Sequence, residues 1–460
     1  MDTFIPKLNA NIGARVAGSV LVLRAFVLLS MLAISVTTFA RAQDRLSSTD
    51  EKQTTADLSS RRVAQPAGVV ESSDKESHKK KAPRETLALQ PDAAGRQSGE
   101  ASNAAQKGEW VIAPIPVKSP AIGAGLQWAV GYVTPFSKDD KVSPPSMFGV
   151  GGLFTSNGSR GLAIGARLYL KEDKYRISFA GGHASINAEI YGVGKLAGDR
   201  GVFVPVNAKG TAFFTESLFR VGKGIYLGAR FQYRNLALSI DRQNSDLPDD
   251  VVINPPAQLA DIIAVIKDNL FRQKTVAVGP RFQWDTRDNT FYPRRGVFLD
   301  SGIDLFAEAI GSKFSYQYYK AAFNKYIGLG DHQLVAVRAM GCAAAGDRVP
   351  AYDLCLFGFQ NDLRGYTAGR YQDRRMFATQ AEYRFTVPRP GFLGRFGLVA
   401  FGGVGGVGSK FTDIGFSDML PAGGAGIRFR LTKRNPINFR IDYGYGKTGG
   451  SFIVGVGEAF

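Results

Sequence analysis

From residue 109 onward, apolar and polar residues alternate with a period of two, which is the pattern of β-strands. The segment 437–446 shows it most clearly, because isoleucine, phenylalanine and tyrosine side chains share one face while asparagine, arginine and aspartate side chains share the other. The segments 225–234 and 377–386 repeat the scheme. Each such strand needs an apolar environment on one side and water on the other. The pattern predicts an all-β fold over residues 109–460.

Two β architectures fit this alternation, a soluble sandwich and a membrane barrel. Many segments run for ten or more residues, the length that a tilted transmembrane strand requires. Aromatic residues gather near the segment ends, as they do in the interfacial girdles of barrels. After residue 42 no run of about 18 apolar residues occurs, which excludes a helical membrane bundle. We therefore predict an outer-membrane β-barrel.

The last ten residues, Ser451–Phe460, alternate again. Phe452, Val454, Val456 and Phe460 would share one face, and Glu458 interrupts that face where it could sit in water at the rim. A last strand with a terminal aromatic resembles the signal by which outer-membrane barrels are recognised for insertion. Phe460 is thus our predicted terminal insertion signal. We expect the barrel-assembly machinery to bind this strand, and outer-membrane lipid and lipopolysaccharide to surround the barrel.

Fifteen alternating segments can be counted, the first near 121–133 and the last near 450–460. Single-chain bacterial barrels normally have an even number of strands. We therefore predict a 16-stranded antiparallel barrel. The uncounted strand is expected before residue 273, where the stretches 191–220 and 241–272 are difficult to interpret.

The amino-acid composition of residues 1–108 differs from that of residues 109–460. Arg15 and Arg24 precede an uncharged apolar stretch, and Ala40-Arg41-Ala42 forms a small-x-small cleavage site, so residues 1–42 are predicted to be a signal peptide for Sec-type export. Residues 43–108 contain no Phe, Tyr, Trp or Ile and are rich in polar residues, so we expect a disordered tail. Its Lys79–Lys81 run is interpreted as solvated, and no nucleic-acid partner is expected.

Two segments stand out from the general alternation. The first is W-D-T-R-D-N at 284–289, followed by Y-P-R-R-G at 292–296, and the second is G-F-Q-N-D-L-R-G-Y at 358–366. Together with the strand A-E-Y-R-F at 381–385 and a terminal phenylalanine, in this order, they resemble the BamA/TamA-type superfamily of outer-membrane assembly barrels, also called the bacterial surface antigen family. The resemblance covers about Ala121 to Phe460.

The resemblance implies a barrel whose sixth extracellular loop folds back into the lumen. Its tip, Leu363, Arg364, Gly365 and Tyr366, would reach the inner wall, where Arg364 pairs with an acid that matches Glu382. The alternation independently places Glu382 on the lumen face.

The family often carries a second acid on the next strand, but Gly403 stands at that place. We therefore expect no other acid of the motif to compensate, and the loop to be held less firmly.

The first motif is interpreted as a charged periplasmic turn with a structural role. Asp285, Arg287 and Asp288 supply the charges, and Pro293 and Gly296 shape the chain reversal.

The two cysteines, Cys342 and Cys355, are thirteen residues apart, and the parity of the strand count places both at the oxidising exterior. A disulfide at the base of the loop is predicted. The alternative is two free thiols.

Family members that insert or secrete proteins carry periplasmic POTRA domains, for which residues 43–108 have too few apolar residues. The chain is thus expected to be a POTRA-less member that acts in outer-membrane protein or lipid assembly or transport, with an unknown client. The alternative is a passive pore that favours anions, because Arg167, Arg230, Arg428, Arg430 and Arg440 lie on polar faces. No catalytic motif, metal-ligand cluster or cofactor motif is apparent, so we expect neither an enzyme nor a bound cofactor.

Overall fold

The computed structural model describes residues 108–119, 123–137, 139–241, 255, 257–267, 271–359 and 362–460. The predicted signal peptide and tail therefore lie outside the described residues. Sixteen strands form one sheet: β1 Glu109–Ser119, β2 Gly123–Thr134, β3 Ser146–Thr155, β4 Arg160–Leu170, β5 Tyr175–Ile190, β6 Val204–Gly222, β7 Ile225–Ile240, β8 Phe271–Asp285, β9 Gly296–Phe306, β10 Tyr316–Gly328, β11 Gln333–Ala345, β14 Arg375–Thr386, β15 Phe396–Gly408, β16 Leu420–Arg430, β17 Asn438–Gly446 and β18 Gly449–Val456.

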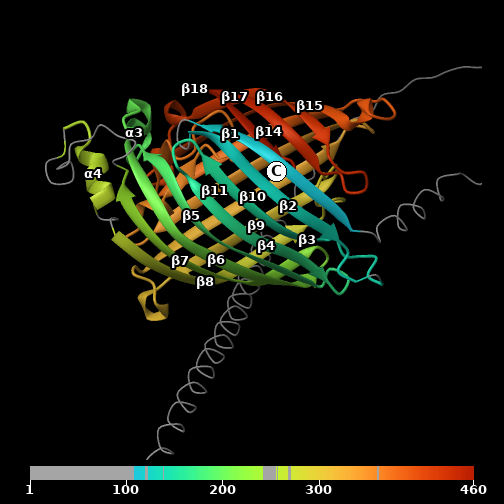
Figure 1. The fold of residues 1–460 in the computed structure, drawn as a ribbon, viewed down its shortest axis with the longest axis horizontal. Coiled ribbons are helices and arrows are strands. Elements are labelled where there is room, and N and C mark those ends of the chain that lie inside the picture. Colours follow the sequence, from blue (N-terminus) through green and yellow to red (C-terminus); the bar gives the residue numbers. More distant parts are fainter. Residues whose placement is uncertain are drawn as a thin grey trace, which may run out of the picture. The chain divides into compact units, whose positions relative to one another are not determined.

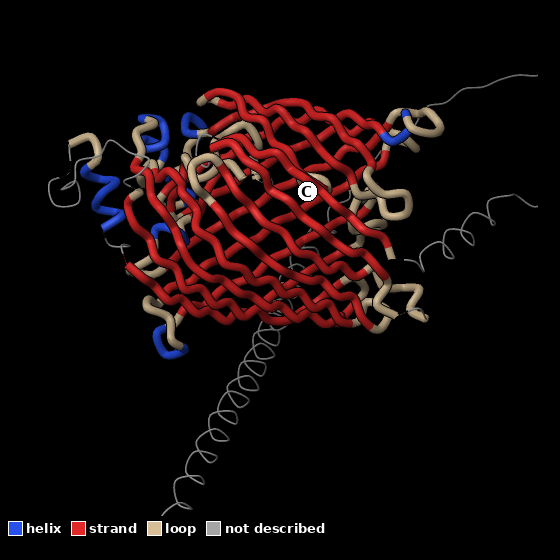
Figure 2. The backbone as a smooth tube through the Cα atoms, in the orientation of Figure 1, coloured by secondary structure: helices blue, strands red, loops and turns tan. Residues whose placement is uncertain are grey.

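Each of these strands pairs antiparallel with its neighbours in chain order, from β1 through β18, and the sheet curls into a nearly closed barrel (Figure 1). The strands cross the wall obliquely, as Figure 2 shows. β1 and β18 are the two edges of the sheet and lie next to each other. The predicted 16-stranded antiparallel barrel is thus confirmed.

The barrel has an apolar outside and a polar inside. On β17, Ile441, Tyr443 and Tyr445 are 42%, 43% and 62% exposed, whereas Arg440 and Asp442, which alternate with them, are 5% and 0% exposed. This distribution inverts that of a soluble protein and suits a wall between lipid and a polar lumen.

The uncounted strand is β1, which lies before residue 273 as expected, although it is not in the stretches 191–220 or 241–272. Pro114 and Pro116 obscured it, because proline is depleted in strands. Residues two apart present their backbone nitrogens to the same side, so both missing N–H donors fall on one side of β1. A strand at a sheet edge tolerates this.

The two ends of the barrel differ. At one end lie the connections 191–203, 241–270 and 346–374, and the other end has mostly short turns such as 223–224. Barrels of the bacterial outer membrane have long extracellular loops and short periplasmic turns. We call the two ends the loop end and the turn end. The stretches 191–220 and 241–272, which were difficult to interpret from the sequence, contain two short helices at the loop end, α3 Lys195–Arg200 and α4 Ala260–Lys267 (Figure 1).

Helix α4 is held by apolar packing. Ile262, Ile263 and Ile266 are at most 2% exposed and contact Val204 and Val206 at the start of β6. The described residues also form five 3-10 turns: η3 Glu308–Ile310, η4 Ala351–Asp353, η5 Leu393–Arg395, η6 Phe411–Asp413 and η7 Phe416–Asp418. No helix in the described part of the chain is both long and apolar enough to span a membrane.

Candidate functional site

The connection 346–374 between β11 and β14 folds into the barrel lumen. It contains two short strands, β12 Cys355–Phe357 and β13 Tyr371–Asp373, which pair antiparallel with each other. This small hairpin closes the base of the loop, and the segment between its strands forms the tip. Leu363 and Tyr366 at the tip are 0% and 3% exposed, so the tip is covered by the barrel wall.

Arg364 is the most completely enclosed charged residue of the tip, with a side chain that is 0% exposed. Its Nη1 lies 2.7 Å from Asp442 Oδ2, and its Nη2 forms an ion pair with Glu382. Its Nε donates to Gln380 Oε1 at 3.2 Å, and the guanidinium carbon lies 3.6 Å from the centre of the Phe401 ring. Arginine suits this place because its planar group can bind two carboxylates and stack on an aromatic ring at the same time.

An acid outside the motif takes the place of the one that Gly403 lacks. Asp442 on β17 supplies the second carboxylate, from two strands beyond β15. Gly403 has a different reason to be small: a Cβ atom there would lie 2.9 Å from Leu363 Cδ1 and 2.1 Å from the Thr379 carbonyl oxygen. The space above Gly403 is therefore occupied by the loop tip itself.

Gly365 lets the backbone of the tip touch the wall. Its φ of +117° lies in a region that other residues rarely adopt, and its N atom would lie 2.8 Å from a Cβ atom placed on Gly444. Tyr366 follows it and donates its hydroxyl to the Pro421 carbonyl oxygen at 2.6 Å. The L-R-G-Y sequence thus combines an apolar contact, an ion pair, a backbone contact and a hydrogen bond to the wall.

The ion pairs of Arg364 belong to a larger network of inward-facing charges. Glu382 also pairs with Arg384 at 2.7 Å, and Asp442 pairs with Arg428 at 2.6 Å. Arg428 continues to Glu458 at 2.8 Å. Positive and negative groups alternate, so each buried charge has an opposite neighbour, as burial of charge requires.

Glu458 was expected at the rim in water, and that expectation was wrong. Its side chain is 3% exposed, and Asn438 Nδ2 donates to its Oε1 at 2.7 Å. Burial by itself would raise the pKa of Glu458, but Arg384 and Arg428 beside it lower this pKa to about 2.

Phe460 does not share the outward face of Phe452 and Val454, so our prediction for that face was wrong. β18 ends at Val456, and Gly457 adopts a φ of +83°. Phe460 packs near the inward-facing Tyr326, and its carbonyl oxygen accepts a hydrogen bond from Arg384 Nη2 at 2.8 Å. Its role as an insertion signal stays a prediction.

The structure contains a disulfide between Cys342 on β11 and Cys355 on β12, with Cα atoms 5.8 Å apart. It fastens the loop hairpin to the wall. Both cysteines belong to an apolar cluster that also includes Phe357, Leu363 and Tyr371.

The loop base is also tied to the loop end of the barrel. Tyr371 donates its hydroxyl to Asp199 Oδ1 at 2.9 Å, and Lys447 Nζ lies 2.9 Å from the same carboxylate. Asp199 belongs to α3, and Lys447 lies in the turn between β17 and β18. Burial would raise the pKa of Asp199, but the hydrogen bonds from Lys447 and Tyr371 lower it.

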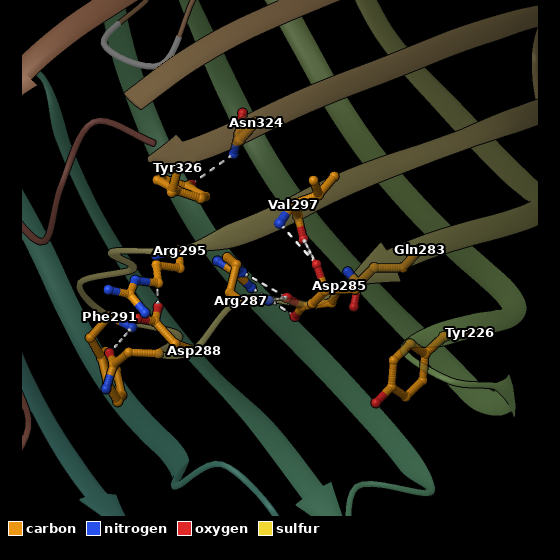
Figure 3. A network of polar contacts seen from close by, with 12 residues as sticks. Tyr226, Gln283, Asp285, Arg287, Asp288, Phe291, Arg295, Val297, Asn324 and Tyr326 are labelled. Carbon is orange, nitrogen blue, oxygen red and sulfur yellow. Dashed lines mark hydrogen bonds and ion pairs between the residues drawn. The ribbon is translucent and has the colours of Figure 1, made fainter. Parts of the chain in front are cut away.

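The W-D-T-R-D-N segment is more than a solvated turn. Asp285 and Arg287 form a two-pronged pair inside the barrel, with Arg287 Nε 2.9 Å from Asp285 Oδ1 (Figure 3). Arg176 on β5 joins them at 2.8 Å from Asp285 Oδ2 and stacks on Tyr226, 3.8 Å from the ring centre. The side chains of Asp285 and Arg287 are 4% and 11% exposed, so these two charges of the turn motif are buried inside the barrel.

The rest of this segment does shape a turn. Asp288 Oδ1 accepts hydrogen bonds from the backbone N–H groups of Arg294 and Arg295 at 2.9 and 3.2 Å. Pro293 is buried, and Gly296 has a φ of +105°.

Sequence reasoning missed Asp442, Arg384, Arg428 and Arg176 as members of the two networks. The signal for Asp442 was present, because the alternation over 437–446 places it on the lumen face together with Arg440. Which inward residues meet the loop depends on the path of residues 346–374, and alternation carries no information about that path.

Comparisons with known proteins identify the family of this chain. A family model described as the Omp85 superfamily domain matches residues 154–460. Among solved structures, the chain is similar to BamA from Haemophilus ducreyi lacking POTRA domains 1–3, at 14% identity over 76% of this chain and 69% of that chain, with a TM-score of 0.45.

Two further structures are CdiB from Acinetobacter baumannii (13% identity, TM-score 0.48) and CdiB from Escherichia coli (10% identity, TM-score 0.49). Each match covers 76% of this chain, which spans 59% and 61% of the respective CdiB chains. A comparison with curated proteins returned no match. The family match extends over all of the motif segments and most of the barrel strands, and the chain belongs to the Omp85 superfamily as an outer-membrane β-barrel protein.

Proposed function

We propose that this barrel acts in the assembly or transport of proteins or lipids at the outer membrane, and that it is not an open pore. The observation that carries the proposal is the burial of Arg364 between Glu382 and Asp442 inside the lumen. Family membership supports the class of activity.

The packing around the loop supports a plugged lumen. Phe357, Leu363 and Tyr371 are 0% exposed and pack against inward-facing wall residues such as Met376 and Leu420. A close-packed apolar cluster leaves little room for water. A water-filled porin lumen would instead present solvated side chains at this depth.

The arrangement of lumen charges weakens the anion-pore alternative. Arg230 pairs with Glu216 at 2.7 Å, and Arg428 pairs with Asp442 and Glu458. Each of these arginines has its charge offset by a nearby carboxylate, so the field available to select anions is reduced.

The test is reconstitution of the purified barrel in liposomes, followed by measurement of the insertion rate of an unfolded outer-membrane protein. We expect insertion to be faster than in empty liposomes and in liposomes with an unrelated barrel of similar size. Equal rates in all three would contradict an assembly role in protein insertion. Single-channel recording on the same preparation distinguishes the proposed role from the passive-pore alternative, because a passive pore gives large and steady anion-selective conductance.

A further inference from the structure

Three basic residues lie in one row across the outer wall of the barrel, on strands β4, β6 and β8. The strand register pairs Arg160 with Ser185, Ser185 with Lys209, Lys209 with Ala237 and Ala237 with Arg272. Neighbouring strands are about 4.8 Å apart, so successive cations of the row are about 10 Å apart along the wall.

All three side chains belong to the outward face. Leu162, two residues from Arg160, is 55% exposed, and Phe213, four residues from Lys209, is 40% exposed. Gln273 next to Arg272 is 1% exposed and faces inward, which places Arg272 outward because neighbours in a strand alternate. The row is thus directed away from the lumen and from its carboxylates.

Polar side chains fill the wall beside the row. Asn207 Nδ2 donates to Ser185 Oγ at 3.0 Å, and Asn187 accepts a further hydrogen bond from Asn207. Ser185 lies between Arg160 and Lys209, the two asparagines lie beside it on the loop-end side of the row, and together they provide hydrogen-bonding partners for a sugar headgroup. Within the described residues, none of Arg160, Lys209 and Arg272 forms an ion pair or a side-chain hydrogen bond.

The acid that shares this face of β5 is Glu189, four residues farther than Ser185 toward the loop end. Its carboxylate accepts the hydroxyl of Tyr191. Because Glu189 lies four residues from the row and is hydrogen-bonded to Tyr191, it does not neutralise the positive charge of the row. The arginines of the lumen, in contrast, are paired with carboxylates.

The level of the row on the wall identifies what it faces. Four pairings farther toward the turn end, the register joins Ile164, Gly181, Phe213 and Tyr233, and Ile164 is 57% exposed. The row therefore borders the apolar belt on its loop-end side. In an outer-membrane barrel this is the level of the lipid headgroups of the outer leaflet.

We propose that Arg160, Lys209 and Arg272 bind the phosphate groups of an outer-leaflet lipid of the lipopolysaccharide class. Arginine forms paired hydrogen bonds to phosphate oxygens, and lysine contributes a point charge. The acyl chains of the same lipid would lie on the apolar belt below the row. This site is separate from the loop anchor and does not depend on the proposed assembly activity.

The test compares the binding of lipopolysaccharide, and of the same lipid after removal of its phosphates, to the detergent-solubilised full-length protein by native mass spectrometry. The variant replaces Arg160, Lys209 and Arg272 with glutamine. We expect phosphorylated lipid to bind the wild type, and binding to the triple variant to be at least about tenfold weaker. Removal of the lipid phosphates should weaken binding to the wild-type protein by a similar factor.

A matched control removes three exposed lysines at the turn end, Lys174, Lys223 and Lys325, which should leave binding unchanged. If the triple variant fails to fold, Lys209→Gln and Lys209→Arg replace it, and only the glutamine variant should lose affinity. Equal binding by the row variant and the wild type would overturn the proposal. So would equal binding of the dephosphorylated lipid, or competition by inorganic phosphate at concentrations similar to those of the lipid.

Discussion

Arg364 and Asp442 are 78 residues apart in the sequence, and Arg364 Nη1 lies 2.7 Å from Asp442 Oδ2 inside the barrel. This pair joins the tip of the inward-folded loop to the second-last strand of the barrel. Because Glu382 on β14 binds the same guanidinium group, one arginine links the loop to two strands on either side of β15 and β16.

Replacement of Arg364 by alanine should release the loop. It leaves Glu382 and Asp442 without their shared partner, and loss of one member of a buried pair costs roughly 3 kcal/mol. We expect faster protease cleavage in the connection 346–374 and a rise in single-channel conductance. Arg348→Ala is the control, because Arg348 is an exposed arginine of the same loop. Identical cleavage and conductance in the two variants would refute the anchor.

An acid at position 403 should weaken the loop instead of strengthening it. The Gly403→Asp side chain would collide with Leu363 and with the backbone of Thr379, and overpacking of this kind costs about 1–3 kcal/mol. We expect a lower thermal midpoint and more protease cleavage than in the wild type. Gly402→Ala on the outward face, where a Cβ atom has room, should change neither. A Gly403→Asp barrel more stable than the wild type would show that the loop does not occupy this space.

Removal of the disulfide should loosen the base of the same loop. The bond closes a segment of 13 residues, and a crosslink of that size contributes about 3 kcal/mol. The variant with Cys342→Ser and Cys355→Ser should lose its compact, heat-modifiable gel form at a lower temperature than the wild type. Reductant should shift the wild type to the same midpoint and leave the variant unchanged. A midpoint in the wild type that is insensitive to reductant would argue against the bond.

Docking of the loop should depend on pH through Asp362. Burial raises the pKa of this loop carboxyl to about 7, although the N–H of Leu363 and the charges of Lys320 and Arg338 oppose the shift. Because the folded pKa exceeds the usual 3.8, the stabilisation is fully present below about pH 4 and is lost as the pH rises through 7. The loss is at most about 4 kcal/mol.

Asp362→Asn removes this titration and should make protease sensitivity of the loop constant between pH 5 and 8, where the wild type becomes more sensitive. Asp347→Asn, at an exposed position of the same loop, is the control and should follow the wild type. A wild-type loop whose sensitivity falls as the pH rises would have the wrong sign for this account.

Much of the fold could be predicted from the sequence because strand alternation is a local property. It placed Glu382 and Asp442 inside the barrel and located fifteen of the strands within a few residues. β1 was not predicted because it contains Pro114 and Pro116. Proline is depleted in strands and is acceptable here only because β1 is an edge of the sheet. That edge is a property of the whole sheet and not of the segment.

The site was less accessible to sequence reasoning. The motif resemblance pointed to Arg364 and Glu382, but Asp442 and Gly403 acquire their roles from the path of the loop across the lumen. The inward turn of the chain after Gly457, which brings Glu458 to Arg428, likewise breaks the alternation that the preceding strand sets. Contacts between segments far apart in the chain decide these features.

The most direct test of the loop anchor is a double-mutant cycle between Arg364 and Asp442. It uses Arg364→Ala, Asp442→Asn and the double variant, with the free energy of unfolding measured in denaturant for the barrel folded in lipid vesicles. The account predicts a coupling energy of about 1–3 kcal/mol, because each single variant disrupts the same buried pair. Additive effects, with a coupling energy below about 0.5 kcal/mol, would show that the two residues do not interact and would contradict the anchored loop.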